Sequence, residues 1–455
     1  MKLLLTLVAS AVIAGSAFAA DAVRPNILFI VADDMGYADC GVQGCRDIPT
    51  PHLDALAASG IHFTDGYVTG TVCSPSRCAL MTGRYQQRDG VNDWIRPASK
   101  EGINPGVPTI ASYLKKAGYQ TALIGKWHLG EQEIFEPLNR GFDYFYGFLG
   151  GDRSYFPYPP GKNPIPGKEL TEGGKPVAQP AYTTLGFGQK AVDFISKQKG
   201  RSKPFFLYLA FNAVHTPLQA PEDYLARFTS ITNQRRRTYA GMVSAMDDAI
   251  GSVLKAVQDA GVADNTLTCF ISDNGGPITR NAPNSSRNDP LRGGKGETWE
   301  GGVRVPFFMK WSGHLPAGQK FTRPAMQMDL TATVLALAGV TVDPQWPIDG
   351  VDLRPFLIGD RSADPHATLC WEHGEQWAIR QGSWKLTYAF PAKMAKTPVL
   401  GLYDLSQDIG ESHDLSAEHP DRVNAMQAAW AVWRKDVEGD APVRKFNIKK
   451  VNESE

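Results

Sequence analysis

The stretch CSPSR at residues 73–77 places a thiol, a proline and an arginine within one turn of a helix. Pro75 fits the first turn of a helix, where its missing N–H is not needed, and the residues that follow are compatible with a helix. Cys73 is therefore expected at a helix N-terminus, where free N–H groups, the dipole and the nearby Arg77 favour an anion. For an unmodified cysteine this predicts an activated thiolate nucleophile. A buried or disulfide-bonded cysteine is the alternative.

Four apolar runs of strand length each end in polar residues. NILFIVA (26–32) is followed by Asp33 and Asp34, and TLTCFIS (266–272) by Asp273 and Asn274. The other two runs are TALIG (121–125), followed by Lys126 and His128, and PFFLYLAF (204–211), followed by His215. A solvated loop is the alternative for any one of these clusters, but four clusters of complementary chemistry weaken it.

Segments typical of helices separate these runs, at 52–59, 109–117 and 235–260. Strands that alternate with helices predict an α/β fold, with a mainly parallel sheet covered by helices on both faces. Ligands of such sheets bind beyond the carboxyl ends of the strands. The four polar strand ends are therefore expected to form one site.

Adjacent carboxylates at the end of a buried strand repel each other and lose hydration, so Asp33 and Asp34 require a counter-charge. Asp273 and Asn274 add further oxygen ligands. A set of oxygens favours calcium or magnesium over zinc, and calcium tolerates irregular geometry better. Asp-Asn-Gly-Gly is also a good turn sequence, which is the alternative for the second pair.

CSPSR matches the Cys-x-Pro-x-Arg signature of the sulfatases of the alkaline phosphatase superfamily. The chain resembles that family, and most closely its exported bacterial carbohydrate sulfatases, from about residue 24 to about residue 415, in the motifs DDMGYADCG, TPHLDALAASGIHFTDGY, ALMTGRY, GKWHLG, SDNGG and GGKGETWEGGVRVP. The resemblance implies an alkaline-phosphatase-like fold, with a large mainly parallel sheet flanked by helices and a small C-terminal antiparallel sheet with a helix.

The resemblance implies that a formylglycine-generating maturation enzyme converts Cys73 to formylglycine (3-oxoalanine). One hydroxyl of the hydrated aldehyde then attacks sulfur and displaces the alcohol. The other is deprotonated and expels sulfate, which restores the aldehyde. The ligands of one calcium ion, carried over in the same way, are Asp33, Asp34, Cys73, Asp273 and Asn274.

The same resemblance assigns roles to five further residues. Arg77 and Lys126 steady the aldehyde hydrate and the sulfate oxygens, and His128 is the base that breaks down the sulfated intermediate. His215 and Lys295 contact the sulfate ester and assist departure of the alcohol. Independently, histidine suits proton transfer near neutrality and lysine suits diffuse charge on a sulfuryl group. An ordinary loop histidine is the alternative for each His.

From about residue 361 the pattern changes. WAIRQGSWKLTYAF alternates like antiparallel strands, and 419–437 reads as an amphipathic helix. We therefore predict a catalytic α/β domain at 20–360 and a smaller C-terminal α+β subdomain at 361–455, which resembles the subdomain beside the active-site mouth of sulfatases. His373 and Glu375 are candidates to face the substrate there, with an exposed turn as the alternative.

Residues 141–176 are rich in aromatic residues and then in Gly and Pro, so they are expected to form an irregular loop. Asp152 and Arg153 in this loop are candidate substrate contacts. Many arylsulfatases place a hydroxyl residue near the sulfate where this chain has Gly150 and Gly151, which puts that sulfate contact in doubt. Residues 235–237, three arginines, are expected on a solvated helix face.

The chain has 455 residues, with 47 Lys and Arg against 47 Asp and Glu, so its neutrality gives no reason to expect a nucleic-acid partner or a membrane surface. Residues 1–19 read as a signal peptide, with a lysine, a short apolar stretch and an Ala-Phe-Ala cleavage signal; a retained anchor is the alternative. The mature chain is therefore expected to be exported, periplasmic or secreted, without a membrane anchor.

Six cysteines are too few for a disulfide scaffold in a chain of this length. Cys40 and Cys45 are spaced so that a disulfide between them is feasible but not demanded. Cys269 and Cys370 lie in apolar runs and are expected to be inert core thiols.

The first functional hypothesis is a calcium-dependent sulfatase that acts on a sulfated poly- or oligosaccharide. The second is a phosphodiester or phosphonate monoester hydrolase of the same superfamily. The third is a non-catalytic sugar-binding protein on a hydrolase scaffold, which the presence of Cys73, His128 and the metal carboxylates disfavours.

Overall fold

The computed structural model describes residues 24–159, 165–278, 284–391 and 395–438. The signal peptide predicted at 1–19 lies outside these residues. Within these ranges, no helix combines the length and the apolar character needed to cross a bilayer.

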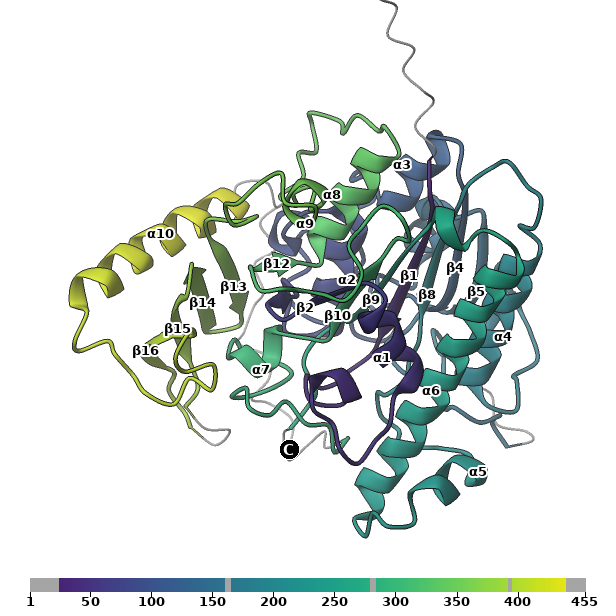
Figure 1. The fold of residues 1–455 in the computed structure, drawn as a ribbon, viewed down its shortest axis with the longest axis horizontal. Coiled ribbons are helices and arrows are strands. Elements are labelled where there is room, and N and C mark those ends of the chain that lie inside the picture. Colours follow the sequence, from purple (N-terminus) through teal and green to yellow (C-terminus); the bar gives the residue numbers. More distant parts are fainter. Residues whose placement is uncertain (1–23, 160–164, 279–283, 392–394, 439–455) are drawn as a thin grey trace, which may run out of the picture.

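A mixed sheet of ten strands forms the centre of the molecule (Figure 1). Its neighbouring strands β9, β1, β8, β4 and β5 run parallel, so their carboxyl ends share one edge. In spatial order the strands are β11 (Gln319–Phe321), β2 (Ile61–Phe63), β10 (Phe307–Lys310), β9 (Thr266–Ser272), β1 (Asn26–Ala32), β8 (Phe205–Ala210), β4 (Gln120–Lys126), β5 (Tyr144–Phe148), β6 (Thr171–Glu172) and β7 (Lys175–Pro176). The strands β3 (Gly66–Tyr67) and β12 (Ala325–Met326) form a separate pair.

Side chains of β1 alternate between two hydrophobic cores, which explains its unbroken apolar run. Leu28 and Ile30 belong to one core, and Phe29 and Val31 to the other. The first core is covered by α1 (Pro51–Ala58), α4 (Thr183–Ser196), α5 (Glu222–Leu225) and α6 (Gln234–Asp259). The second is covered by α2 (Cys73–Thr82), α3 (Ile110–Lys116), α8 (Met328–Leu337) and α9 (Arg354–Leu357). The predicted α/β architecture is confirmed.

Helices α1 and α6 are joined by a buried cap. The helix α1 begins at Pro51, and the carboxylate of Asp247 in α6 accepts hydrogen bonds from the backbone N–H groups of His52 (3.1 Å) and Leu53 (2.9 Å). These N–H groups have no partner inside their own helix. Asp247 is 1% exposed, and burial raises its pKa to about 6.

The C-terminal region forms a four-stranded antiparallel sheet with one helix, as predicted. The sheet contains β13 (Leu369–His373), β14 (Gln376–Gln381), β15 (Trp384–Ala389) and β16 (Val399–Asp404), and α10 (Pro420–Glu438) packs on it. Lys385 in β15 is fully buried between Glu300 of α7 (Glu300–Val303) and Glu411, at 2.9 Å from each. The pair with Glu300 ties the small sheet to α7.

Two expectations from the sequence are wrong in part. The segment 141–176 is not wholly irregular, because β5, β6 and β7 extend the large sheet. Arg236 is not on a solvated face, because it is 7% exposed and pairs with Asp39 (2.6 Å) and Asp47 (2.8 Å). Arg235 is exposed as expected.

The cysteines are free thiols in this structure. Cys40 donates a hydrogen bond to Gln43 (2.8 Å) and Cys45 donates one to Asp47 (3.2 Å), so the disulfide considered for this pair is not formed. Cys269 and Cys370 are each 1% exposed, as expected for core thiols.

Candidate active site

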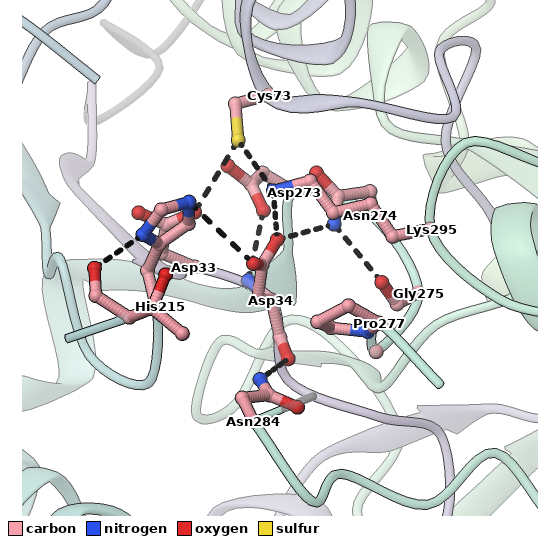
Figure 2. Close-up of polar contacts among 12 residues, drawn as sticks. Asp33, Asp34, Cys73, His215, Asp273, Asn274, Gly275, Pro277, Asn284 and Lys295 are labelled. Atoms are coloured by element: carbon pink, nitrogen blue, oxygen red, sulfur yellow. Dashed lines mark hydrogen bonds and ion pairs between the residues drawn. The ribbon is translucent and has the colours of Figure 1, made fainter. Parts of the chain in front are cut away.

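The residues that follow the four predicted strands meet at one edge of the sheet. Cys73, the first residue of α2, and Lys295, from the loop before α7, join them there (Figure 2). The residues that the structure brings together are Asp33 and Asp34 after β1, Lys126 and His128 at the end of β4, His215 after β8, and Asp273 and Asn274 after β9.

Each carboxylate of the site has a cation beside it. Lys126 lies 2.6 Å from Asp33, and Lys295 lies 2.6 Å from Asp34. Arg77, one turn into α2, lies 2.8 Å from Asp273. Buried charges are tolerated when they are paired in this way.

Burial and these cations set the pKa values of the carboxylates. Burial raises the pKa of Asp33 in spite of the nearby Lys126. Burial also acts to raise the pKa of Asp34, but Lys295 and His215 outweigh it and bring the value to about 2. For Asp273 the effect of burial is likewise outweighed, chiefly by Arg77, and its pKa is lowered.

The carboxylate and amide oxygens of the site fit a hard cation. Ligand atoms of Asp33, Asp34, Cys73 and His215 all lie within 4.8 Å of one another. The Oδ1 atom of Asn274 is buried and has no hydrogen-bond partner in the described part of the chain, while its Nδ2 donates to Asp34 (2.7 Å). A buried acceptor oxygen without a donor, beside several carboxylates, suits a hard divalent cation.

Cys73 begins α2 as predicted, but the expected thiolate does not form. Its Sγ lies 3.5 Å from Asp33 and 3.4 Å from Lys295. Burial raises the pKa of the thiol to about 12, and the attraction of Lys126 and Lys295 for the thiolate does not compensate. The prediction from the sequence included the helix dipole and Arg77 but omitted desolvation, which here is the larger effect.

His128 is a neutral imidazole with one free nitrogen. Its Nε2 lies 3.0 Å from the carbonyl oxygen of Ile95, which can only accept, so Nε2 carries the proton. Nδ1 therefore carries the lone pair, and it has no partner in the described ranges. Burial, then the charges of Lys126 and Arg77, lower the pKa of His128 well below its usual value. Such a group can accept a proton at neutral pH.

A cavity of about 280 Å³ opens above these residues. Its lining residues are Val72, Cys73, Trp94, Pro97, His128, Gly151, Asp152, His215 and Lys295. A larger hollow of about 780 Å³ beside α1 and α6 contains none of the predicted site residues. Trp94 and Pro97 are not among the residues predicted from the sequence, where the only hint is a tryptophan within the polar stretch VNDWIRPASK.

Asp152 and Arg153, two of the four candidate substrate contacts, differ in their placement. Asp152 lines the cavity, and Lys168 lies 2.7 Å from its carboxylate. Arg153 is 1% exposed and its guanidinium lies over the ring of Phe148, so the structure argues against the expected substrate contact. Arg153 is also not among the residues that line the cavity.

His373 and Glu375 lie in the hairpin between β13 and β14. The ring of His373 lies 3.1 Å from the carbonyl oxygen of Gly296 and 3.4 Å from Asp93, and it is not part of the cavity lining. Glu375 is exposed in the turn. His373 therefore links the small sheet to the loops of the cavity mouth.

Gly151 lies where a side chain would collide with His128. A Cβ atom placed on Gly151 would lie 2.6 Å from Cε1 and from Nε2 of the imidazole ring. The hydroxyl residue that many arylsulfatases have near this position therefore has no room here without a shift of His128.

Comparison with known proteins agrees with this geometry. The family model described as Sulfatase matches residues 25–340. The chain is 40% identical over 360 residues to the human N-acetylgalactosamine-6-sulfatase. This alignment covers 75% of this chain and 67% of that protein. It is 34% identical over 433 residues to bovine arylsulfatase A, in an alignment that covers 86% of this chain and 83% of that protein.

Solved structures give the same result. The crystal structure of Ps i-CgsB in complex with k-i-k-neocarrahexaose superposes with a TM-score of 0.85 at 39% identity, over 92% of this chain and 94% of that chain. The phosphonate monoester hydrolase SpPMH from Silicibacter pomeroyi shares the fold, with a TM-score of 0.69 at 19% identity over 91% of this chain and 96% of that chain.

Proposed function

This chain belongs to the sulfatase family and is a sulfuric ester hydrolase, and on that premise we propose that it releases sulfate from sulfated poly- or oligosaccharides. The observation that carries the proposal is that Cys73 and a neutral His128 line one cavity, while three carboxylates, each paired with a cation, lie at the same edge of the sheet. The named activity of the human relative and the oligosaccharide bound to Ps i-CgsB support a carbohydrate as substrate. The signal peptide predicted at 1–19 supports export of the enzyme to the periplasm or the medium, where such polymers are met.

We propose that a maturation enzyme converts Cys73 to formylglycine. The hydrated aldehyde supplies an oxygen nucleophile that can be regenerated, whereas burial keeps the unmodified side chain a neutral thiol. Residue 73, Asp33, Asp34, Asp273 and Asn274 would hold a calcium ion, which supplies positive charge next to the nucleophile and the sulfate. The unpartnered Oδ1 of Asn274 supports this ligand set.

The remaining residues handle the proton and the charge of the ester. His128 accepts a proton at Nδ1, the nitrogen that lacks a hydrogen-bond partner in the described chain. Arg77 and Lys126, which do not line the cavity, hold residue 73 and the sulfate oxygens from the protein interior. Lys295, 3.4 Å from the sulfur of residue 73, binds them from the cavity side. His215 donates from Nδ1 to the carbonyl of Thr216 (2.7 Å), and its Nε2 lies 3.7 Å from Asp34. It therefore provides a proton from Nε2 to the departing alcohol only as the imidazolium, in which both nitrogens carry protons.

Two measurements test the proposal. Mass spectrometry of the peptide that contains Cys73 should show the aldehyde, and the matured enzyme should release sulfate from members of a panel that includes N-acetylgalactosamine 6-sulfate and carrageenan oligosaccharides. Cys73→Ala should abolish turnover, whereas Cys45→Ala, a thiol remote from the cavity, should not. An active enzyme with an unmodified thiol would contradict the mechanism. Preference for a phosphate ester over the matched sulfate ester would favour the phosphonate monoester hydrolase alternative.

A further inference from the structure

Trp94 combines exposure with a position in the wall of the catalytic cavity. Its side chain is 43% exposed, one of the few large apolar side chains left in solvent within the described ranges. It lines the cavity together with Cys73 and His128. The guanidinium of Arg96 lies 5.8 Å from the centre of its ring. An aromatic face left exposed at the mouth of a polar cavity is costly in water and suits an amphipathic ligand.

The backbone around Trp94 is fixed to the residues that surround the reaction. The N–H of Ile95 donates to Oγ of Ser74, the neighbour of residue 73, at 3.0 Å. The carbonyl of Ile95 accepts from His128 at 3.0 Å. On the other side, Oδ1 of Asp93 accepts from the N–H of Trp94 at 2.7 Å and lies 3.4 Å from His373. Trp94 is therefore held at a defined place relative to residue 73.

We propose that Trp94 is a specificity-determining residue that stacks on the apolar C–H face of the sugar ring bearing the sulfate. The inference rests on the proposed carbohydrate sulfatase function. A pyranose has one face of C–H bonds and an edge of hydroxyls, so it matches a wall that presents an aromatic ring and the carboxylate of Asp152. Because the backbone of Trp94 is held in place before binding, little backbone freedom is lost when the sugar arrives.

The cavity has a sulfate end, around residue 73, and a sugar end, around Trp94, and the two can be tested separately. Inorganic sulfate occupies only the sulfate end, so its inhibition constant reports the machinery around residue 73. The KM for N-acetylgalactosamine 6-sulfate or a carrageenan oligosaccharide, whichever the wild-type enzyme cleaves, reports both ends. The two quantities therefore distinguish a sugar contact from general damage to the site.

Trp94→Leu should raise the KM for the sulfated sugar by about tenfold, which corresponds to about 1.4 kcal/mol, with kcat and the inhibition constant of sulfate nearly unchanged. Trp94→Phe should retain most of the affinity, because it keeps an aromatic face. Val432→Ala, at an exposed apolar position on α10, serves as the control and should leave all constants unchanged. The inference would be overturned if Trp94→Leu left the KM unchanged, or if it raised the KM and the inhibition constant of sulfate by the same factor. A wild-type enzyme that releases no sulfate from any sugar would instead refute the proposed function.

Discussion

Replacement of Gly151 by alanine should disable His128 without unfolding the protein. The new Cβ would lie 2.6 Å from Cε1 and Nε2 of the ring, and ordinary contact begins near 3.4 Å, so the ring must withdraw by about 0.8 Å (3.4 − 2.6). The only direct polar anchor of the ring that the structure describes, the 3.0 Å hydrogen bond to Ile95, would be strained by that movement. A displacement of about 1 Å at a reacting group can cost about a hundredfold in rate. We therefore expect kcat to fall by about 10- to 100-fold.

Steady-state kinetics on a sulfated sugar that the wild-type enzyme cleaves measures this effect, with Gly150→Ala as the matched control. A Cβ on Gly150 would meet the carbonyl of Gly167 at 3.0 Å and Glu131 at 3.2 Å but not His128, so kcat should stay within about twofold of wild type. The pH profile gives a second readout. Burial lowers the pKa of His128, so the acid limb of kcat should lie below the ordinary histidine range and should move upward if Gly151→Ala exposes the ring. Wild-type kcat in Gly151→Ala, or equal losses in both variants, would refute the reasoning.

Three further predictions concern stability. A chelator should lower the Tm and added calcium should restore it, because an ion at a hundredfold excess over its Kd stabilises the fold by about 2.7 kcal/mol. An unchanged Tm would argue against the metal site. Arg236→Met should destabilise the fold by about 3–5 kcal/mol in urea titrations, because Asp39 loses its buried partner, whereas the exposed Arg235→Met should change stability by less than about 0.5 kcal/mol. Burial raises the pKa of Asp247 to about 6 from 3.8, so the folded state binds more protons than the unfolded state between these values. The free energy of unfolding should therefore fall by about 3 kcal/mol as pH rises from about 4 to about 6, and Asp247→Asn should remove this part of the slope; identical slopes would contradict it.

The strands that position the site could be predicted because each is buried on both faces. The apolar runs 26–32 and 266–272 coincide with β1 and β9, and the other two differ from β4 and β8 by a residue or two at their ends. In these four strands no charged residue stands before the last position, as expected for strands packed on helices from both sides. The end of each strand is therefore marked by the first charged residue, and in a parallel sheet that end also marks the site.

Features that depend on contacts between distant segments could not be predicted. Arg236 is adjacent to two other arginines, and only the fold shows that it alone turns inward to Asp39 and Asp47. Arg153 follows Asp152 directly, yet one lines the cavity and the other packs on Phe148. Neighbouring charged residues carry no sequence signal of which one is buried. The role of Trp94 likewise depends on bonds from Ile95 to Ser74 and His128.

The balance of charge explains why the metal and the lysines must act together. In this structure the cations of the site are engaged by its carboxylates, since Lys126 and Lys295 each lie 2.6 Å from an aspartate. The formal charges of the site sum to zero, since the three carboxylates of Asp33, Asp34 and Asp273 balance the three cations of Arg77, Lys126 and Lys295. A divalent ion on the carboxylates would compete with the lysines for the same oxygens and would leave the site with two positive charges. The lysines would then be available to the sulfate oxygens, and the net charge would match the doubly negative sulfate that leaves. Without the ion, the same lysines remain paired and the cavity has little attraction for an anion, so loss of the metal should impair substrate binding.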